Sequence, residues 1–140
     1  MSWSQNVVKR NNMSYSVLDA SALIALLHAE PGSEKVAAAV EEGAAISTVN
    51  LAEVAGKLID LGTPEAAIQD AINLLQLTVY DFTIEFAYTT GRFRPLTKQA
   101  GLSLGDRACL ALAHHLNLPA LTTDRVWEGL PVDVVVHVLR

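Results

Sequence analysis

The stretch Tyr15-Ser-Val-Leu-Asp-Ala-Ser-Ala-Leu-Ile-Ala-Leu-Leu-His28 shows how this chain is built. Its first four residues, 15–18, have the apolar character of a short strand, and residues 20–28 have the composition of an apolar helix. A strand that passes directly into a helix is the repeating unit of α/β proteins. This stretch therefore predicts that the domain opens with a strand and a helix.

The rest of the chain repeats the same alternation. Strands are predicted at 44–46, 77–80, 119–122 and 134–138. Helices are predicted at 34–41, 49–61, 83–90 and 104–116. Because strands that are separated by helices are joined by right-handed crossovers, the pattern predicts a three-layer α/β/α sandwich with a mainly parallel sheet.

Local signals refine this outline in three places. Gly62 stands where a helix C-cap is expected, and Thr63-Pro64 predicts a new helix with Thr63 as the N-cap and Pro64 in the first helical position. Residues 91–101 are expected to form a loop. The helix at 104–116 is apolar on nearly every side, so we expect it to be covered on both faces.

Length and composition limit the class of protein. The 140 residues are 51% hydrophobic and 18% charged, as expected for one domain with a full core. A single cysteine excludes an internal disulfide, and a net charge of −5 argues against binding nucleic acid through overall charge. No apolar run approaches the roughly 20 residues needed to span a bilayer. We expect a soluble cytoplasmic protein, with residues 1–12 as a flexible leader and 13–140 as one domain.

Four acidic residues follow the predicted strands in a regular way. Asp19 closes the first strand, Glu53 lies on the helix after the second, Asp106 opens the apolar helix, and Asp124 follows the fourth strand. Ligands of open parallel sheets bind beyond the carboxyl ends of the strands. We therefore expect these four side chains at one edge of the sheet.

Taken singly, each acid could be structural. The structural interpretations are a helix N-cap at Asp19, a turn residue at Asp124, and the capping boxes Asn50-x-x-Glu53 and Ser103-x-x-Asp106. Taken together, four converging carboxylates would repel one another unless a cation lay among them. Oxygen ligands without Cys or His favour Mg²⁺ or Mn²⁺, and such ions activate water in phosphodiester hydrolysis.

The same residues carry a family resemblance. The motifs are, in order, Val17-Leu-Asp-Ala-Ser21, Ser47-Thr-Val-Asn-Leu-Ala-Glu53, Leu102-Ser-Leu-Gly-Asp106 and Leu121-Thr-Thr-Asp124. From about Tyr15 to the C-terminus, the chain resembles the PIN-domain nucleases. Within that superfamily it is most similar to the VapC toxins of toxin–antitoxin pairs.

The resemblance implies a Mg²⁺- or Mn²⁺-dependent endoribonuclease. It implies that four acids hold the metal and the attacking water, with two hydroxyls supporting them; these are Asp19, Glu53, Asp106 and Asp124, then Ser21 and Thr122. It also implies a homodimer, inhibited by a cognate antitoxin whose tail blocks the acidic groove.

Several basic residues are candidates for contacts with RNA. The densest positive stretch, Arg92-Phe-Arg-Pro-Leu-Thr-Lys98, is either a solvated loop or a rim that binds phosphates through Arg92, Arg94 and Lys98. Lys57 either pairs with Glu53 on the helix surface or contacts phosphate. We expect Arg107 at the rim of the site.

The remaining candidate groups are interpreted as structural, and the apolar helix bears on assembly. The four histidines share no metal-ligand spacing, and Cys109 is expected to be a small core residue. The apolar helix 104–116 and the Ala-rich first half suggest an exposed apolar surface that a homodimer would bury.

Two other functions fit parts of the pattern. An aspartate directly after the first strand could be the nucleophile of an aspartyl-phosphate phosphatase, but those enzymes resemble D-x-D and the third position here is Ser21. A non-catalytic scaffold that binds RNA or a protein would usually have lost some of the acids, and all four are present.

Overall fold

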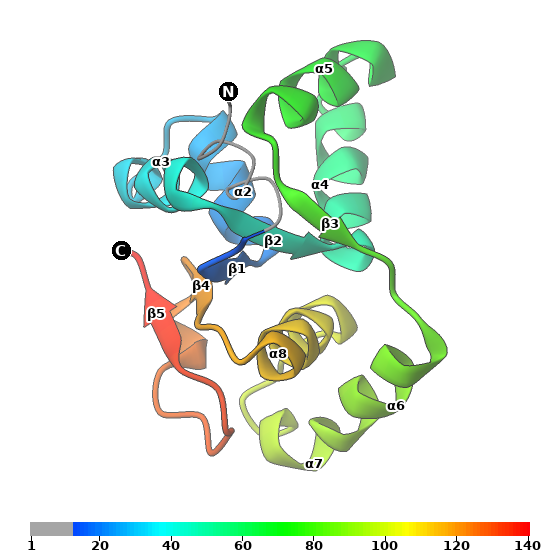
Figure 1. Cartoon of the computed structure of the whole chain (residues 1–140), viewed down its shortest axis with the longest axis vertical. Helices are drawn as coiled ribbons and strands as arrows, with labels where there is room; N and C mark the ends of the chain where they lie inside the picture. The colour runs from blue at the N-terminus through cyan, green and yellow to red at the C-terminus, as the bar shows by residue number, and fades with distance from the viewer. Residues whose placement is uncertain (1–12) are drawn as a thin grey trace.

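A computed structural model describes residues 13–140, which form one sheet covered by helices (Figure 1). The five strands are all parallel and lie in the order β3-β2-β1-β4-β5. Their bounds are β1 Ser16–Leu18, β2 Ala44–Ser47, β3 Thr78–Tyr80, β4 Ala120–Thr122 and β5 Val136–Val138. The predicted α/β/α sandwich is confirmed. The expected leader, 1–12, lies outside the described residues.

Within residues 13–140, eight helical segments connect the strands. They are α2 Ala20–Leu27, α3 Ser33–Glu42, α4 Thr48–Asp60, α5 Glu65–Leu75, α6 Ile84–Arg92, α7 Arg94–Thr97, α8 Leu104–Leu116 and the single 3₁₀ turn η1 Arg125–Trp127. In Figure 1, α2 to α5 lie on one side of the sheet and α6 to α8 on the other. No helix in the described part of the chain is long and apolar enough to cross a membrane.

The pairing of the central strand β1 determines which residues lie together at the carboxyl end of the sheet, the edge where Asp19 follows β1 (the acidic edge). Val17 pairs with Ala45 of β2 on one side and with Ala120 of β4 on the other. Alternate residues of β1 face opposite layers, so Val17 packs in the cluster of α8 and Leu18 in that of α2 and α3. The residues that follow β1 and β4 therefore leave the sheet side by side.

The helix α8 spans the predicted residues and is buried along most of its length. Its side chains pack against the sheet, α6 and Trp127, which confirms the expectation that both faces are covered. The rings of His114 and His115 at its end meet Phe93 and Phe86 edge to face. Because the apolar surface of α8 is buried inside the domain, it is not available as the exposed apolar surface that the sequence suggested for a homodimer.

Two local predictions were wrong. Residues 91–101 are not all loop, because α6 extends to Arg92 and α7 follows. The turn is fixed by burial of Phe93 and Thr97, and the Thr97 hydroxyl donates to the Phe93 carbonyl at 2.9 Å. Pro64 is itself the N-cap of α5 with an extended backbone, and no side-chain capping bond forms there.

Candidate functional site

Asp19 lies at the centre of the acidic edge and is almost completely buried, with 3% of its surface exposed. It is the N-cap of α2, as the structural interpretation predicted, and accepts a hydrogen bond from the Ala22 backbone N–H at 2.8 Å. Two hydroxyls also donate to its carboxylate, Ser21 Oγ at 2.8 Å and Thr122 Oγ1 at 2.5 Å. Three donors thus hold a carboxylate that has no basic partner among residues 13–140.

The environment of Asp19 makes its charge costly. Burial raises its pKa to about 6, and the nearby negative charge of Asp106 acts in the same direction. The hydrogen bonds from Thr122, Ala22 and Ser21 lower the pKa and offset part of this rise. A cation at this edge would stabilise the charged form further.

The two hydroxyls tie the end of β1 to the end of β4. Ser21 Oγ accepts from the Thr123 backbone N–H at 3.0 Å, and Thr122 Oγ1 accepts from the Asp124 N–H at 3.1 Å. Each hydroxyl is therefore left with its hydrogen directed to Asp19. These contacts fit the supporting positions that the resemblance gave to Ser21 and Thr122.

Glu53 is positioned by a residue that the sequence analysis misinterpreted. The predicted capping box Asn50-x-x-Glu53 is wrong, because Ser47 is the N-cap of α4 and accepts from the Val49 N–H at 3.1 Å. Asn50 lies inside α4 with 1% of its surface exposed. Its Nδ2 donates to Glu53 Oε1 at 2.9 Å and to the Gly105 carbonyl at 3.0 Å, so it connects α4 with α8. Its buried Oδ1 has no hydrogen-bond partner among residues 13–140.

Gly105 and Asp106 form the side of the cluster that α8 supplies. The predicted capping box is confirmed: the Ser103 N–H donates to Asp106 Oδ2 at 2.9 Å, and the Asp106 N–H donates to Ser103 Oγ at 3.1 Å. A Cβ atom on Gly105 would overlap the carboxylate of Glu53. Glycine therefore lets Glu53 lie directly against α8.

Three of the four acids lie near one another and act on the buried thiol of Cys109: Glu53 lies against Gly105, next to Asp106, and the charge of Asp106 reaches Asp19. Burial raises the pKa of this thiol, and the negative charges of Asp19, Asp106 and Glu53 raise it further. Cys109 is fully buried in the apolar cluster, as expected. Asp124 differs, because its exposed carboxylate caps η1 by accepting from the Val126 N–H at 3.0 Å. Asp19, Glu53 and Asp106 thus act electrostatically on the same buried residue, and Asp124 is not among the charges that do so.

The chemical type of the ligand atoms at this site suits a hard divalent cation. Its ligands would be carboxylate oxygens, which Mg²⁺ and Mn²⁺ prefer. The buried charge of Asp19 and the unpartnered Oδ1 of Asn50 are features that a cation or its water shell would satisfy. As the side chains stand, however, no three His, Cys, Asp or Glu groups within residues 13–140 are close enough to hold an ion together.

A cleft of about 380 Å³ opens next to the acids. It is lined by Ala20, Ser21, Ile24, Glu30, Glu53, Lys57, Thr123 and Arg140. The cations in its wall are Lys57 and Arg140, and the latter was not singled out from the sequence. In the described part of the chain, Lys57 forms no ion pair with Glu53.

The other basic candidates lie elsewhere. The side chains of Arg92, Arg94 and Lys98 are exposed, and none of them lines this cleft. Arg92 donates to the Thr89 hydroxyl at 3.0 Å. Arg107 is buried rather than placed at the rim, with 8% of its surface exposed.

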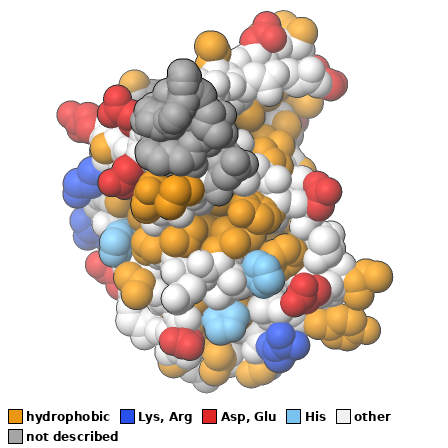
Figure 2. Space-filling view, in the orientation of Figure 1, with side chains coloured by type: hydrophobic (Ala, Val, Ile, Leu, Met, Phe, Trp, Pro, Cys, Tyr) orange, Lys and Arg blue, Asp and Glu red, His pale blue; other side chains and the backbone are white. Residues whose placement is uncertain are grey.

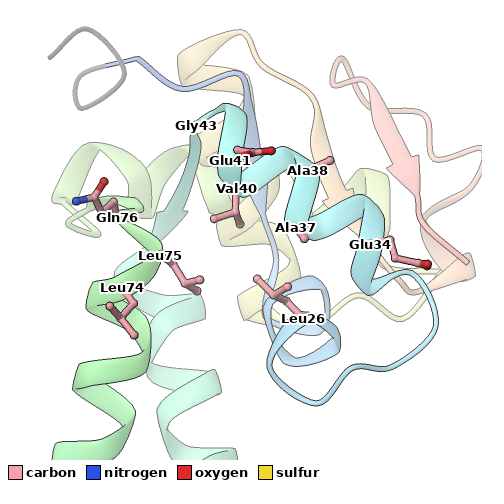
Figure 3. A pocket seen from close by; sticks show the side chains of 10 residues that line it. All are labelled: Leu26, Glu34, Ala37, Ala38, Val40, Glu41, Gly43, Leu74, Leu75 and Gln76. Atoms are coloured by element: carbon pink, nitrogen blue, oxygen red, sulfur yellow. The ribbon is translucent and has the colours of Figure 1, made fainter. Parts of the chain in front are cut away.

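A larger groove lies away from the acids, between α2, α3 and α5. It has a volume of about 780 Å³, and Leu26, Val40 and Leu75 extend into it from the three helices (Figure 3). Glu34 and Glu41 stand on its α3 border. On the face of the molecule shown in Figure 2, apolar side chains gather in the centre and acidic ones are scattered around them.

Known proteins resemble this chain in sequence family and in fold. A family model described as the PIN domain matches residues 16–132. No curated protein sequence is significantly similar to the chain. Solved structures of similar fold include the DNA-bound VapBC from Salmonella typhimurium, with 18% identity, a TM-score of 0.69 and coverage of 89% of this chain and 98% of that one.

Two further structures show the same likeness. VapBC2 from Rickettsia felis, bound to a promoter DNA fragment, has 18% identity and a TM-score of 0.67, with 88% of this chain and 97% of that chain covered. A toxin–antitoxin complex from Klebsiella pneumoniae has 21% identity and a TM-score of 0.65, with 83% and 92% covered. At these identities the likeness concerns the fold.

Proposed function

The chain belongs to the PIN domain family, and from this premise we propose that it is the metal-dependent endoribonuclease toxin of a toxin–antitoxin pair, acting in the cytoplasm. The observation that carries the proposal is the proximity of Asp19, Glu53 and Asp106, with Glu53 against Gly105 next to Asp106 and the charge of Asp106 reaching buried Asp19, while none of the three acids has a basic partner within residues 13–140. A domain selected only for stability has no reason to collect uncompensated carboxylates at a ligand-binding edge.

The proposed metal ligands are the carboxylates of Asp19, Glu53 and Asp106, with Asp124 as the fourth acid. A bound Mg²⁺ or Mn²⁺ supplies a water nucleophile and stabilises the charge on the leaving oxygen of a phosphodiester. Ser21 and Thr122 keep the Asp19 carboxylate in one orientation through their hydroxyl hydrogens. Asn50 does the same for Glu53 through Nδ2.

The test of this function is a cleavage assay on a single-stranded RNA substrate. Cleavage should require Mg²⁺ or Mn²⁺ and stop on addition of EDTA. Asp19→Asn and Asp106→Asn should each lower the rate at least about a hundredfold, because each removes charge from the metal site. Asp70→Asn, an exposed acid on α5, is the matched control and should leave the rate unchanged. Full cleavage in EDTA would contradict the proposal, and hydrolysis of phosphomonoesters alone would favour the phosphatase.

The proposed partners are an antitoxin protein and a second copy of the chain. Support for an antitoxin comes from solved structures of this fold that are toxin–antitoxin complexes. The homodimer is carried over from the family resemblance, since α8 is buried within the domain. Light scattering at micromolar concentration should give twice the mass of the chain, and a particle of 15.0 kDa alone would exclude the dimer.

A further inference from the structure

The cleft beside the acids combines two walls of opposite charge. Glu53 belongs to the acidic cluster, and Ser21 donates directly to Asp19, so one wall is continuous with that cluster. Lys57 and Arg140 supply positive charge to the same cleft. Glu30 also lines the cleft and pairs with Arg140 at 3.4 Å, whereas Lys57 forms no ion pair among the described residues. In a chain with a net charge of −5, these two neighbouring cations are the kind of feature that can hold an anion.

The fold brings these two cations together from distant parts of the sequence. Lys57 follows Glu53 by one turn of α4, so the two residues share a helix face. Arg140 follows β5, and its neighbour Leu139 donates a backbone hydrogen bond to the Thr122 carbonyl at 2.9 Å. The end of the parallel strand β5 thereby carries Arg140 to the edge where β1 and β4 deliver Asp19 and Thr122.

Both cations keep hydrogen-bonding capacity for a ligand. Arg140 Nη1 contacts Glu30 Oε1 at 3.4 Å and the Pro31 carbonyl at 3.3 Å, both long contacts on a partly exposed side chain. Its Nη2 and Nε make no hydrogen bond among the described residues. Lys57 is exposed and makes neither an ion pair nor a hydrogen bond there. A planar guanidinium fork and a mobile ammonium group are both suited to phosphate oxygens.

We propose that Lys57 and Arg140 form a phosphate subsite that binds the RNA backbone next to the bond that is cut. The inference rests on the proposed ribonuclease function and names the residues that would position its substrate. It differs from the sequence-based prediction, which placed the RNA contacts at Arg92, Arg94 and Lys98. The cleft favours Lys57 and Arg140 because it is shared with Glu53 and Ser21, whereas those three residues do not line it.

The test is a binding titration of a fluorescent single-stranded RNA dodecamer at several salt concentrations, with Asp19→Asn as the cleavage-dead parent. Each single-strand phosphate contact contributes about 0.7 to the slope of log K against log salt. Lys57→Ala and Arg140→Ala should each lower the slope by about this amount, and the double variant by about 1.4. Lys35→Ala, an exposed lysine on α3, is the control for loss of one charge. The triple variant Arg92→Ala/Arg94→Ala/Lys98→Ala should keep the slope of the parent.

The outcomes separate the two proposals. An unchanged slope in Lys57→Ala and in the double variant overturns the subsite, provided that the wild-type chain cleaves RNA. If the triple variant alone lowers the slope, the rim predicted from the sequence is the binding surface instead. If the wild-type chain cleaves no RNA in Mg²⁺ or Mn²⁺ and the parent does not bind RNA, the proposed function itself fails. Because Arg140→Ala also removes the Glu30 contact, its melting temperature is measured and Lys57→Gln serves as a second variant that breaks no contact.

Discussion

Replacing Gly105 with alanine should separate the stability of the domain from the function of its site. The added Cβ would overlap the carboxylate of Glu53, which is the mobile end of an exposed side chain. Glu53 can therefore rotate away, but it then loses the hydrogen bond from Asn50 Nδ2. The backbone of Gly105 is helical, so alanine itself introduces no strain.

The expected change in the free energy of unfolding is small because two effects oppose each other. Alanine in place of glycine stabilises a helix by up to about 1 kcal/mol. Loss of the Asn50–Glu53 hydrogen bond costs about 0.5–1.5 kcal/mol. The melting temperature of Gly105→Ala should therefore lie within a few degrees of the wild type.

The effect on the site should be large. Because the Glu53 carboxylate is displaced, Gly105→Ala should lower RNA cleavage and Mn²⁺ affinity to the level of Glu53→Ala. The double variant Gly105→Ala/Glu53→Ala should be no worse than Glu53→Ala alone, since both changes remove the same carboxylate. The control is Gly91→Ala on α6, where an added Cβ meets nothing within 4 Å.

Three measurements decide this case: thermal unfolding by circular dichroism, Mn²⁺ titration by electron paramagnetic resonance, and cleavage of the RNA substrate. Full Mn²⁺ affinity and cleavage in Gly105→Ala would refute the reasoning, because Glu53 would then not depend on the absence of a Cβ. A fall of more than 10 degrees in melting temperature would refute it in another way, by showing that the site lost function through unfolding.

Three further predictions concern the residues around Asp19. Its pKa of about 6 in the folded state exceeds the ordinary 3.8, so the folded state binds the proton more tightly. The free energy of unfolding should therefore fall by roughly 3 kcal/mol in total as pH rises from about 3 to about 7. In urea titrations with EDTA, Asp19→Asn should lose this slope, and an equal slope in both proteins would contradict the assignment. Thr122→Val removes a donor to Asp19 and should raise its pKa further in an NMR titration, whereas Thr122→Ser should restore the wild-type value. Asn50→Ala leaves the buried Gly105 carbonyl without its side-chain donor and should lower the free energy of unfolding by about 1–3 kcal/mol in urea, a loss that a wild-type unfolding curve would disprove.

Local sequence signals predicted those parts of the site that depend on neighbouring residues. Asp19 caps α2 and Asp106 completes a capping box with Ser103, and both contacts join residues three positions apart. The strands and most helices were predicted because the alternation of apolar strand and helix is also a local pattern. The parallel pairing follows from the same alternation, whereas the strand order β3-β2-β1-β4-β5 was not predicted.

The parts that could not be predicted depend on long-range contacts. Asn50 looks like a capping residue in the sequence, and its role emerges only when Gly105, 55 positions later, meets α4. Residues 94–97 form a helix because Phe93 and Thr97 are buried by tertiary packing, which the loop-like composition does not reveal. Arg140 reaches the cleft through the pairing of β5 with β4, so nothing near it in sequence marks it as a candidate.

The directions of the helices also bear on the acidic edge. The helices α2 and α8 both begin there, with Asp19 as the N-cap of one and Asp106 in the first turn of the other. A helix N-terminus carries about half a positive charge from its aligned peptide dipoles. Two such ends offset part of the repulsion among the carboxylates without any ion. The chain can therefore keep Asp19 and Asp106 at the same edge of the sheet before any ion is bound, because the helix ends offset part of the cost of their charges.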